Sequence, residues 1–181
     1  MGRAAPPFCE VVRDLVDVAE LRSAKDDFFR RAHDSPLTVE QRASFAGLRY
    51  FPEDVSYRFA VTVDTASAGG TDEVEMSDGS TNTMRRAGAV RFEIAGERAE
   101  LVAYEQGEEL FIPFRDGTSG QETYGAGRYV EAEPLGGGSF ALDFNRAYNP
   151  YCAYNEHWRC PLPPRENWLH VPIRAGELSF H

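Results

Sequence analysis

Residues 90–114 read VRFEIAGERAELVAYEQGEELFIPF, and the predicted fold follows from the pattern in this stretch. Apolar and charged side chains alternate over residues 90–94, which is the period of a β-strand that buries one face. The pattern breaks at Gly96 and again at Gly107, where tight turns can join one strand to the next. The stretch therefore predicts three consecutive antiparallel strands.

The same texture extends toward the N-terminus. Alternation over residues 57–63 predicts a further strand, and Asp78-Gly79 is a strong signal for a hairpin turn. We expect Gly88 to turn the chain again, between two short strands. Local hairpins of this kind predict a mainly β fold for residues 55–181, built as a curved antiparallel sheet or a barrel-like meander.

The pattern continues toward the C-terminus. The glycines at 136–138 predict the tip of a hairpin between residues 128–133 and 139–144. Alternation over residues 169–173 predicts a last strand. The run CPLPP at 160–164 cannot form a helix interior or a central strand, so we expect it to cross the surface as an extended, polyproline-like segment.

The N-terminal part, residues 10–45, is predicted to be helical. Residues 10–32 contain neither Gly nor Pro, and their apolar residues recur at the three- and four-residue spacing of one long amphipathic helix. We expect this helix to bury Leu15, Val18 and Phe28 against the sheet or over one end of a barrel.

A second, short helix is predicted near residues 38–45, because Thr38 and Gln41 have the spacing of a capping box. The chain contains no linker long enough to separate two domains. Residues 1–181 are therefore expected to form a single domain, in which the helical segment packs on the β-rich body.

Composition argues against several function classes. The chain has 181 residues, with 19 Lys and Arg against 29 Asp and Glu, for a net charge of −10. Such an acidic chain is not expected to grip nucleic-acid phosphates or an anionic membrane. No glycine-rich stretch follows the strand-to-helix pattern of a phosphate-binding loop. The sequence has no recognisable signal peptide and no apolar run of ~20 residues, so we expect a cytoplasmic protein. We also expect no bound metal or cofactor.

Seven residues in the last part of the chain are candidates for a ligand-binding site. Arginine forks match carboxylates and phosphates, and neighbouring acidic groups can orient them or act as acid or base. A functional site of this composition predicts a small anionic ligand, with enzymatic activity left open. The same residues can form a structural network of ion pairs, and the sequence does not decide between the two. The candidates are Arg115, Asp116, Tyr124, Arg128, Asp143, Asn145 and Arg146.

The hairpin around residues 136–138 predicts how four of these residues meet. Pairing across its tip brings Arg128 near Arg146, and like charges opposite each other destabilise a sheet. We therefore expect Asp143, Asp116 or an anionic ligand to lie between the two arginines.

Two of the three cysteines, Cys152 and Cys160, are separated by a short loop that ends in prolines, so we expect them to be close in space. Three interpretations remain open for this thiol pair. The thiols can be buried and free, they can form a lasting or reversible disulfide, or they can bind a metal together with His157. The spacing C-x4-H-x2-C matches none of the usual zinc motifs. Cys9 is isolated near the N-terminus.

The alternative function is a non-catalytic interaction module. Aromatic residues and prolines are frequent at protein interfaces, and both are concentrated near the C-terminus. Exposed tryptophans gathered in one patch would favour this alternative, whereas charged residues that converge on one concave pocket would favour a ligand site. The partner surface would combine residues 160–164 with Tyr148, Tyr151, Tyr154, Trp158 and Trp168.

Several long words of the sequence resemble one known family. Together they look like the prokaryotic family catalogued as domain of unknown function 1684, and the resemblance covers nearly the whole chain. The resemblance implies a family but no activity, so it assigns no role to any residue. The words are FIPFRD at 111–116, GRY at 127–129, LDFNRAYNPYCAYN at 142–155 and CPLPP at 160–164, with KDDFF at 25–29 and YFP at 50–52 upstream.

Overall fold

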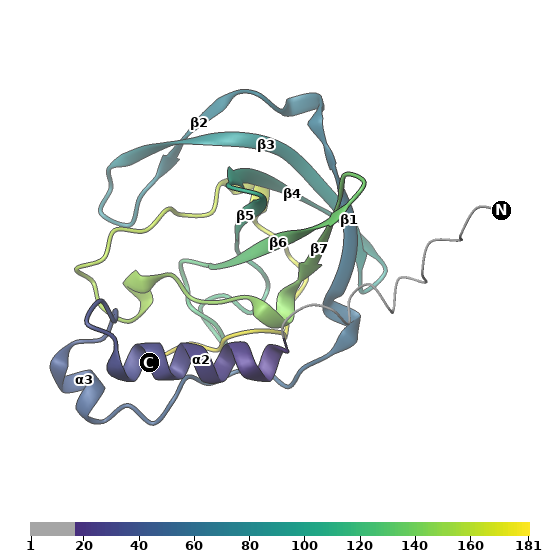
Figure 1. The fold of residues 1–181 in the computed structure, drawn as a ribbon. Helices are drawn as coiled ribbons and strands as arrows, with labels where there is room; N and C mark the ends of the chain where they lie inside the picture. Colours follow the sequence, from purple (N-terminus) through teal and green to yellow (C-terminus); the bar gives the residue numbers. More distant parts are fainter. Residues whose placement is uncertain (1–16) are drawn as a thin grey trace.

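Antiparallel pairing closes the β-rich part of the chain into a barrel (Figure 1). The computed structural model describes residues 17–181. Its seven-stranded sheet has the order β1-β7-β6-β5-β4-β3-β2, and β1 also pairs with β3. The first six strands of this order therefore form a ring, and β2 extends from it. The mainly β prediction is confirmed, as a barrel. The strands are β1 (Arg58–Asp64), β2 (Thr71–Glu75), β3 (Thr81–Ile94), β4 (Glu97–Gln106), β5 (Glu109–Phe114), β6 (Arg128–Gly136) and β7 (Ser139–Asp143).

Apolar side chains that alternate along the strands fill the barrel interior. Val90 on β3 pairs with Leu101 on β4, and Ile112 on β5 pairs with Val130 on β6. All four side chains are fully buried, as is Leu142 on β7. Burial of each such side chain stabilises the fold by about 1.5–3 kcal/mol. The alternation within residues 90–114 therefore encodes one wall of the core.

The prediction of a turn at Gly88 is wrong, because β3 runs through this position as one strand of 14 residues. The ladder between β3 and β4 shifts register between Arg86 and Gly88, which is the signature of a β-bulge. On the side of β3 that faces away from β4, the strand pairs first with β2 and then, from Ala89 and Val90 on, with β1. The bulge lies between these two pairings. A bend at this point, rather than a turn, closes the barrel.

The last strand predicted at residues 169–173 is also wrong. The Leu169 N–H donates to the carbonyl of Arg115 (2.8 Å), but the segment joins no ladder. Ile173 is fully buried in the barrel core, and Leu169 packs against that core. The alternation in this segment therefore reflects burial against the barrel end and the loop after β5, without a partner strand.

Within residues 17–181, two α-helices precede the barrel, α2 (Val18–Arg31) and α3 (Val39–Ala43). The capping box predicted for α3 is confirmed: the Gln41 N–H donates to the Thr38 hydroxyl (3.2 Å), and the Thr38 N–H donates to the Gln41 side chain (2.8 Å). Short 3-10 helices follow in the chain, namely η2 (Val55–Tyr57), η3 (Thr65–Ser67), η4 (Phe144–Arg146), η5 (Tyr151–Ala153) and η6 (Arg165–Asn167).

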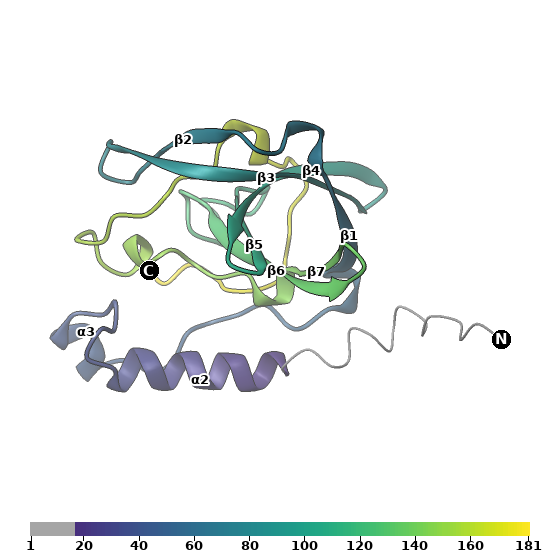
Figure 2. The same cartoon turned by 45° about the horizontal axis from the view of Figure 1, so that its top comes forward.

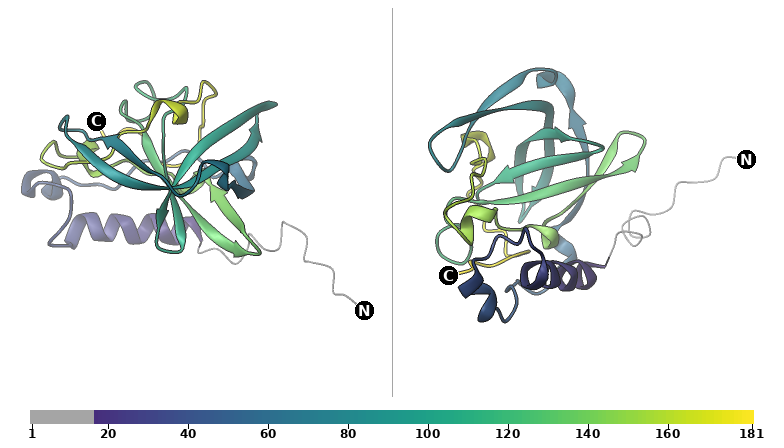
Figure 3. Two further views of the ribbon diagram at one scale, coloured as in Figure 1. Left: turned by 90° about the horizontal axis from the view of Figure 1, so that it is seen from above. Right: turned by 60° about the vertical axis from the view of Figure 1, so that its left-hand side comes forward.

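Helix α2 lies along one end of the barrel, and the segment after β7 runs between the two (Figures 1 and 2). The right-hand view of Figure 3 shows the same arrangement from the side. Val18 is buried as predicted, but Phe29, rather than Phe28, is the buried aromatic residue of the helix. Its ring centroid lies 4.9 Å from that of Tyr154. The predicted start of the helix, including Leu15, lies outside the described residues. Within residues 17–181, no helix has both the length and the apolar character needed to cross a bilayer.

Substitution of Gly88 by Ala tests the closure of the barrel. Its φ is +142°, and an added Cβ would lie 2.3 Å from the carbonyl oxygen of Asp64. We expect strain and overpacking to lower stability by about 2–4 kcal/mol and the melting temperature by roughly 5–10 °C. Gly70→Ala is the matched control, because nothing lies within 4 Å of the Cβ position there. Equal melting temperatures for the two variants would contradict the assigned role of Gly88.

Candidate functional site

The predicted site residues fall into separate groups, and the first is a sealed ion pair. Arg128 and Asp116 are both buried, with 3.4 Å between guanidinium and carboxylate. Arg128 also donates to the carbonyls of Ile173 (2.9 Å), Ala175 (2.5 Å) and Glu177 (3.2 Å). Burial lowers the pKa of Arg128, and the Asp116 carboxylate opposes that shift. These contacts fasten the C-terminal segment to the barrel and leave no room for a ligand between the two groups.

The second group contains Asp143 and Asn145, which fix the end of β7. The Asp143 carboxylate accepts from Arg58 (3.0 Å) and from the backbone N–H of Asn145 (2.9 Å). The Asn145 amide bridges to Asp54, donating to its carbonyl (2.8 Å) and accepting from its N–H (2.9 Å). Asp143 therefore caps η4, and both side chains hold the segment that leads into β1.

The predicted meeting of Arg128 with Arg146 is wrong. The register Ala132↔Leu142 would set Arg146 opposite Arg128 if β7 continued. However, β7 ends at Asp143 and the chain turns into η4, so that Arg146 pairs with Glu133 on β6 instead (2.5 Å). The turn removes the like-charge contact that we expected an acid or an anion to relieve.

Arg115 and Tyr124 lie elsewhere again. The Arg115 guanidinium lies 4.5 Å from the ring centroid of Trp168, and the Tyr124 hydroxyl points at the sulfur of Cys152 (3.9 Å). The seven predicted residues therefore do not converge on one cavity. Of the seven, Asn145 and Arg146 line a cleft beside helix α2.

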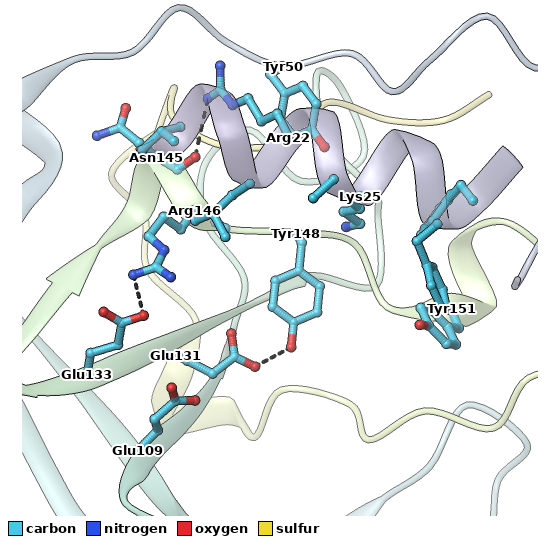
Figure 4. A pocket seen from close by; sticks show the side chains of 16 residues that line it. Arg22, Lys25, Tyr50, Glu109, Glu131, Glu133, Asn145, Arg146, Tyr148 and Tyr151 are labelled. Carbon is cyan, nitrogen blue, oxygen red and sulfur yellow. Dashed lines mark hydrogen bonds and ion pairs between the residues drawn. The ribbon is translucent and has the colours of Figure 1, made fainter. Parts of the chain in front are cut away.

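That cleft has a volume of about 480 Å³ and lies between α2 and the barrel end (Figure 4). One wall is the inner side of α2, which combines apolar residues such as Leu21 with the basic Arg22 and Lys25. The facing wall is acidic, because Glu109, Glu131 and Glu133 project from β5 and β6. Three tyrosines complete the lining, namely Tyr50, Tyr148 and Tyr151.

Half of the charged residues that line the cleft are already paired. Lys25 forms an ion pair with the buried Glu177 (2.7 Å), and Arg146 is neutralised by Glu133. Glu131 differs, since within residues 17–181 its carboxylate has no cationic partner at ion-pair distance and accepts a hydrogen bond from the Tyr148 hydroxyl. Burial raises the pKa of Glu131, and the negative charge of Glu109 adds to the shift.

Among the cations that line the cleft, Arg22 has no ion-pair partner within residues 17–181. It donates to the Asn145 carbonyl (3.2 Å), and its guanidinium lies 4.4 Å from the ring centroid of Tyr50. Its Nε and the Tyr50 hydroxyl are buried and have no hydrogen-bond partner among residues 17–181. Burial lowers the pKa of Arg22. Glu109 likewise has no ion-pair partner within residues 17–181, so the cleft carries one unpaired cation and two unpaired carboxylates.

The predicted proximity of Cys152 and Cys160 is confirmed, because the Cys152 N–H donates to the sulfur of Cys160 (3.3 Å). Both thiols are free. The ring of His157 contacts Asn155 (2.6 Å), not the thiols. In the described ranges no three His, Cys, Asp or Glu side chains are grouped so as to hold a metal ion. The geometry therefore does not favour the metal interpretation of the thiol pair.

The sequence reasoning missed Glu131, Arg22 and Lys25. The sequence patterns that predicted the strand at β6 and the helix at α2 also contain a signal for each of these residues. Glu131 alternates with buried residues along β6, where an acidic side chain next to Tyr129 is unusual. Arg22 and Lys25 follow Val18 at helical spacing, so basic groups stand beside the apolar stripe of α2.

Comparisons with known proteins support a family. The family model described as "Protein of unknown function (DUF1684)" matches residues 43–178, which include the whole barrel but not α2. The chain is similar to the solution NMR structure of an uncharacterized protein of Haloarcula marismortui, with 39% identity and a TM-score of 0.70. That similarity covers 90% of this chain and 92% of the other. No curated protein matches the chain.

Two arginine variants compare the buried Arg128–Asp116 ion pair with the partly solvated Arg146–Glu133 ion pair. We expect Arg128→Met to cost about 3–5 kcal/mol of stability, because it leaves Asp116 buried without its cation. Arg146→Met should cost about 1 kcal/mol or less, because its pair with Glu133 is partly solvated. Urea unfolding measures both values, and a loss for Arg146→Met as large as that for Arg128→Met would refute the expected difference.

Proposed function

The chain belongs to the family of proteins of unknown function DUF1684, and we propose that it binds a small organic molecule with a protonated amine in the cleft between α2 and the barrel. The observation that carries the proposal is Glu131. Its carboxylate is largely buried and lines the cleft, and it has no cationic partner within residues 17–181.

A buried carboxylate is costly unless a cation or a proton compensates it. Glu109 is close enough to Glu131 to raise its pKa, so the acidic wall offers two carboxylates to one incoming charge. The ring of Tyr148 and the apolar residues of α2 can receive the hydrocarbon part of the ligand. A volume of about 480 Å³ lies within the usual range of roughly 300–1,000 Å³ for small-molecule sites.

An anionic ligand, the expectation from the sequence, is the second candidate. The observation that favours it is Arg22, which has no carboxylate partner in the described residues and whose buried Nε lacks an acceptor. Arg128 and Arg146, which the sequence suggested for this role, are neutralised by Asp116 and Glu133. A carboxylate or phosphate would therefore bind at the Arg22 end of the cleft.

The alternative of an interaction module has less support. Trp158 and Trp168 are both exposed, but they have different neighbours. Trp158 packs on the ring of Tyr151, whereas Trp168 lies between Arg115 and Arg165. The two tryptophans therefore do not share neighbouring residues, as residues of one partner surface would.

Matched indole compounds test the two ligand classes by thermal shift. We expect tryptamine, a cation at neutral pH, to raise the melting temperature, because a ligand at 100 times its dissociation constant adds about 2.7 kcal/mol of stability. Indole-3-acetate carries the same ring with a carboxylate and should have little effect. Glu131→Gln should remove most of the tryptamine shift, and Glu97→Gln, an exposed site on β4, should retain it.

The pH dependence adds an independent check. The pKa of Glu131 is raised, so the carboxylate takes up a proton at a higher pH than an ordinary glutamate does. Tryptamine affinity should therefore fall as the pH is lowered toward that raised pKa, and this dependence should weaken in Glu131→Gln. Stabilisation by indole-3-acetate that Arg22→Met abolishes would instead support the anionic candidate. If neither compound changes the melting temperature, the result would count against both classes of ligand.

A further inference from the structure

Cys152 and Cys160 are held together by backbone contacts from two separate parts of the chain. Cys152 lies in η5, and Cys160 lies on the proline segment beside the end of β2. The Cys160 carbonyl accepts from the Ser77 N–H (2.8 Å), and its own N–H donates to the Ser77 hydroxyl (3.0 Å). These contacts fix the Cys160 sulfur against the backbone of Cys152.

Donors converge on the Cys152 sulfur. The Tyr124 hydroxyl points at it from 3.9 Å, and the Cys160 sulfur lies 3.3 Å from the backbone nitrogen of Cys152. The hydrogen bond from Cys160 is the main reason why the pKa of Cys152 is lowered to about 6, although burial opposes the shift. The same bond and burial raise the pKa of Cys160. Cys152 therefore has the lower pKa of the two thiols.

Exposure distinguishes the two sulfurs in the same direction. Cys152 is partly exposed, whereas Cys160 is buried. The cysteine with the lower thiol pKa is thus the more exposed of the two, and the buried cysteine lies next to it. An exposed thiolate beside a second thiol is the arrangement of a reactive cysteine with a resolving partner. Two thiols that only filled apolar space would need no donors around one sulfur.

We propose that Cys152 and Cys160 form a peroxide-reactive thiol pair that closes reversibly to a disulfide. The Cys152 thiolate attacks one oxygen of hydrogen peroxide, the O–O bond breaks, and hydroxide leaves, which gives a sulfenic acid on Cys152. The Cys160 sulfur then attacks the Cys152 sulfur. The S–O bond breaks, and the hydroxyl group leaves as water with the proton of the Cys160 thiol. Each cysteine is oxidised by one electron overall, and the peroxide is reduced to water.

The product would join η5 to the proline segment by a covalent bond. Both segments are already held by hydrogen bonds, Cys152 to Cys160 on one side and Leu162 to the carbonyl of Glu75 (2.8 Å) on the other. Formation of the bond therefore needs no new contact between distant parts of the chain. A dithiol reductant would reverse it by thiol–disulfide exchange.

The test uses the full chain with Cys9 replaced by Ser, so that Cys152 and Cys160 are the remaining thiols. Stoichiometric hydrogen peroxide at pH 7 should remove both titratable thiols and lower the intact mass by two hydrogens, about 2 Da, and dithiothreitol should restore both. Mass gains of one or more oxygens with no loss of hydrogen, or two thiols that survive the treatment, would overturn the proposal.

Two single variants separate the roles of the cysteines. In Cys152→Ser, the buried Cys160 should react with peroxide at least roughly tenfold more slowly than the parent chain does, since it lacks thiolate character and access. In Cys160→Ser, Cys152 should still react with peroxide but stop at a sulfenic acid, which a dimedone adduct reveals. Equal peroxide rates for Cys152→Ser and the parent chain would show that Cys152 is not the reactive thiol.

Discussion

The buried guanidinium of Arg128 is the constraint on which the rest of the molecule depends. It neutralises Asp116 and donates hydrogen bonds to three carbonyls of the C-terminal segment. One of those carbonyls belongs to Glu177, whose own carboxylate is buried and accepts from Lys25, Asn149 and Tyr154. A single arginine at the start of β6 therefore fixes the C-terminal segment, and that segment in turn fixes α2 and the chain after β7.

This chain of contacts also explains the charge of the cleft. Lys25 reaches across from α2 to Glu177, so it is not available to neutralise the acidic wall on β5 and β6. Arg146 is likewise engaged by Glu133. Glu131 keeps an uncompensated charge because both nearby cations have structural partners. Helix α2 precedes residues 43–178, which match the family model. The wall of the cleft that α2 forms therefore lies outside the matched residues.

The sequence predicted what depends on neighbours along the chain. Alternation located the strands, the Thr38 and Gln41 pair located the start of α3, and Asp78-Gly79 marked a hairpin. Features that depend on distant contacts were missed. Gly88 bends β3 because β1 approaches it from 24 residues away at Asp64, and residues 169–173 alternate against a barrel end rather than a strand. The Arg146 error has the same origin, because η4 ends β7 only where Asp143 and Asn145 find Arg58 and Asp54.

Partners, rather than burial, separate structural from functional charges in this fold. Arg128 is more deeply buried than Glu131, yet three carbonyls and a carboxylate accept hydrogen bonds from its two terminal nitrogens, and its removal should affect folding before anything else. Glu131 is partly buried, accepts a hydrogen bond from the Tyr148 hydroxyl and has no cationic partner within residues 17–181. The sequence cannot distinguish these cases, because residue type and spacing do not record which partners arrive from elsewhere in the chain. The distinction needs the three-dimensional contacts, and it is the reason for proposing that Glu131, three residues beyond Arg128, binds a ligand while Arg128 stabilises the fold.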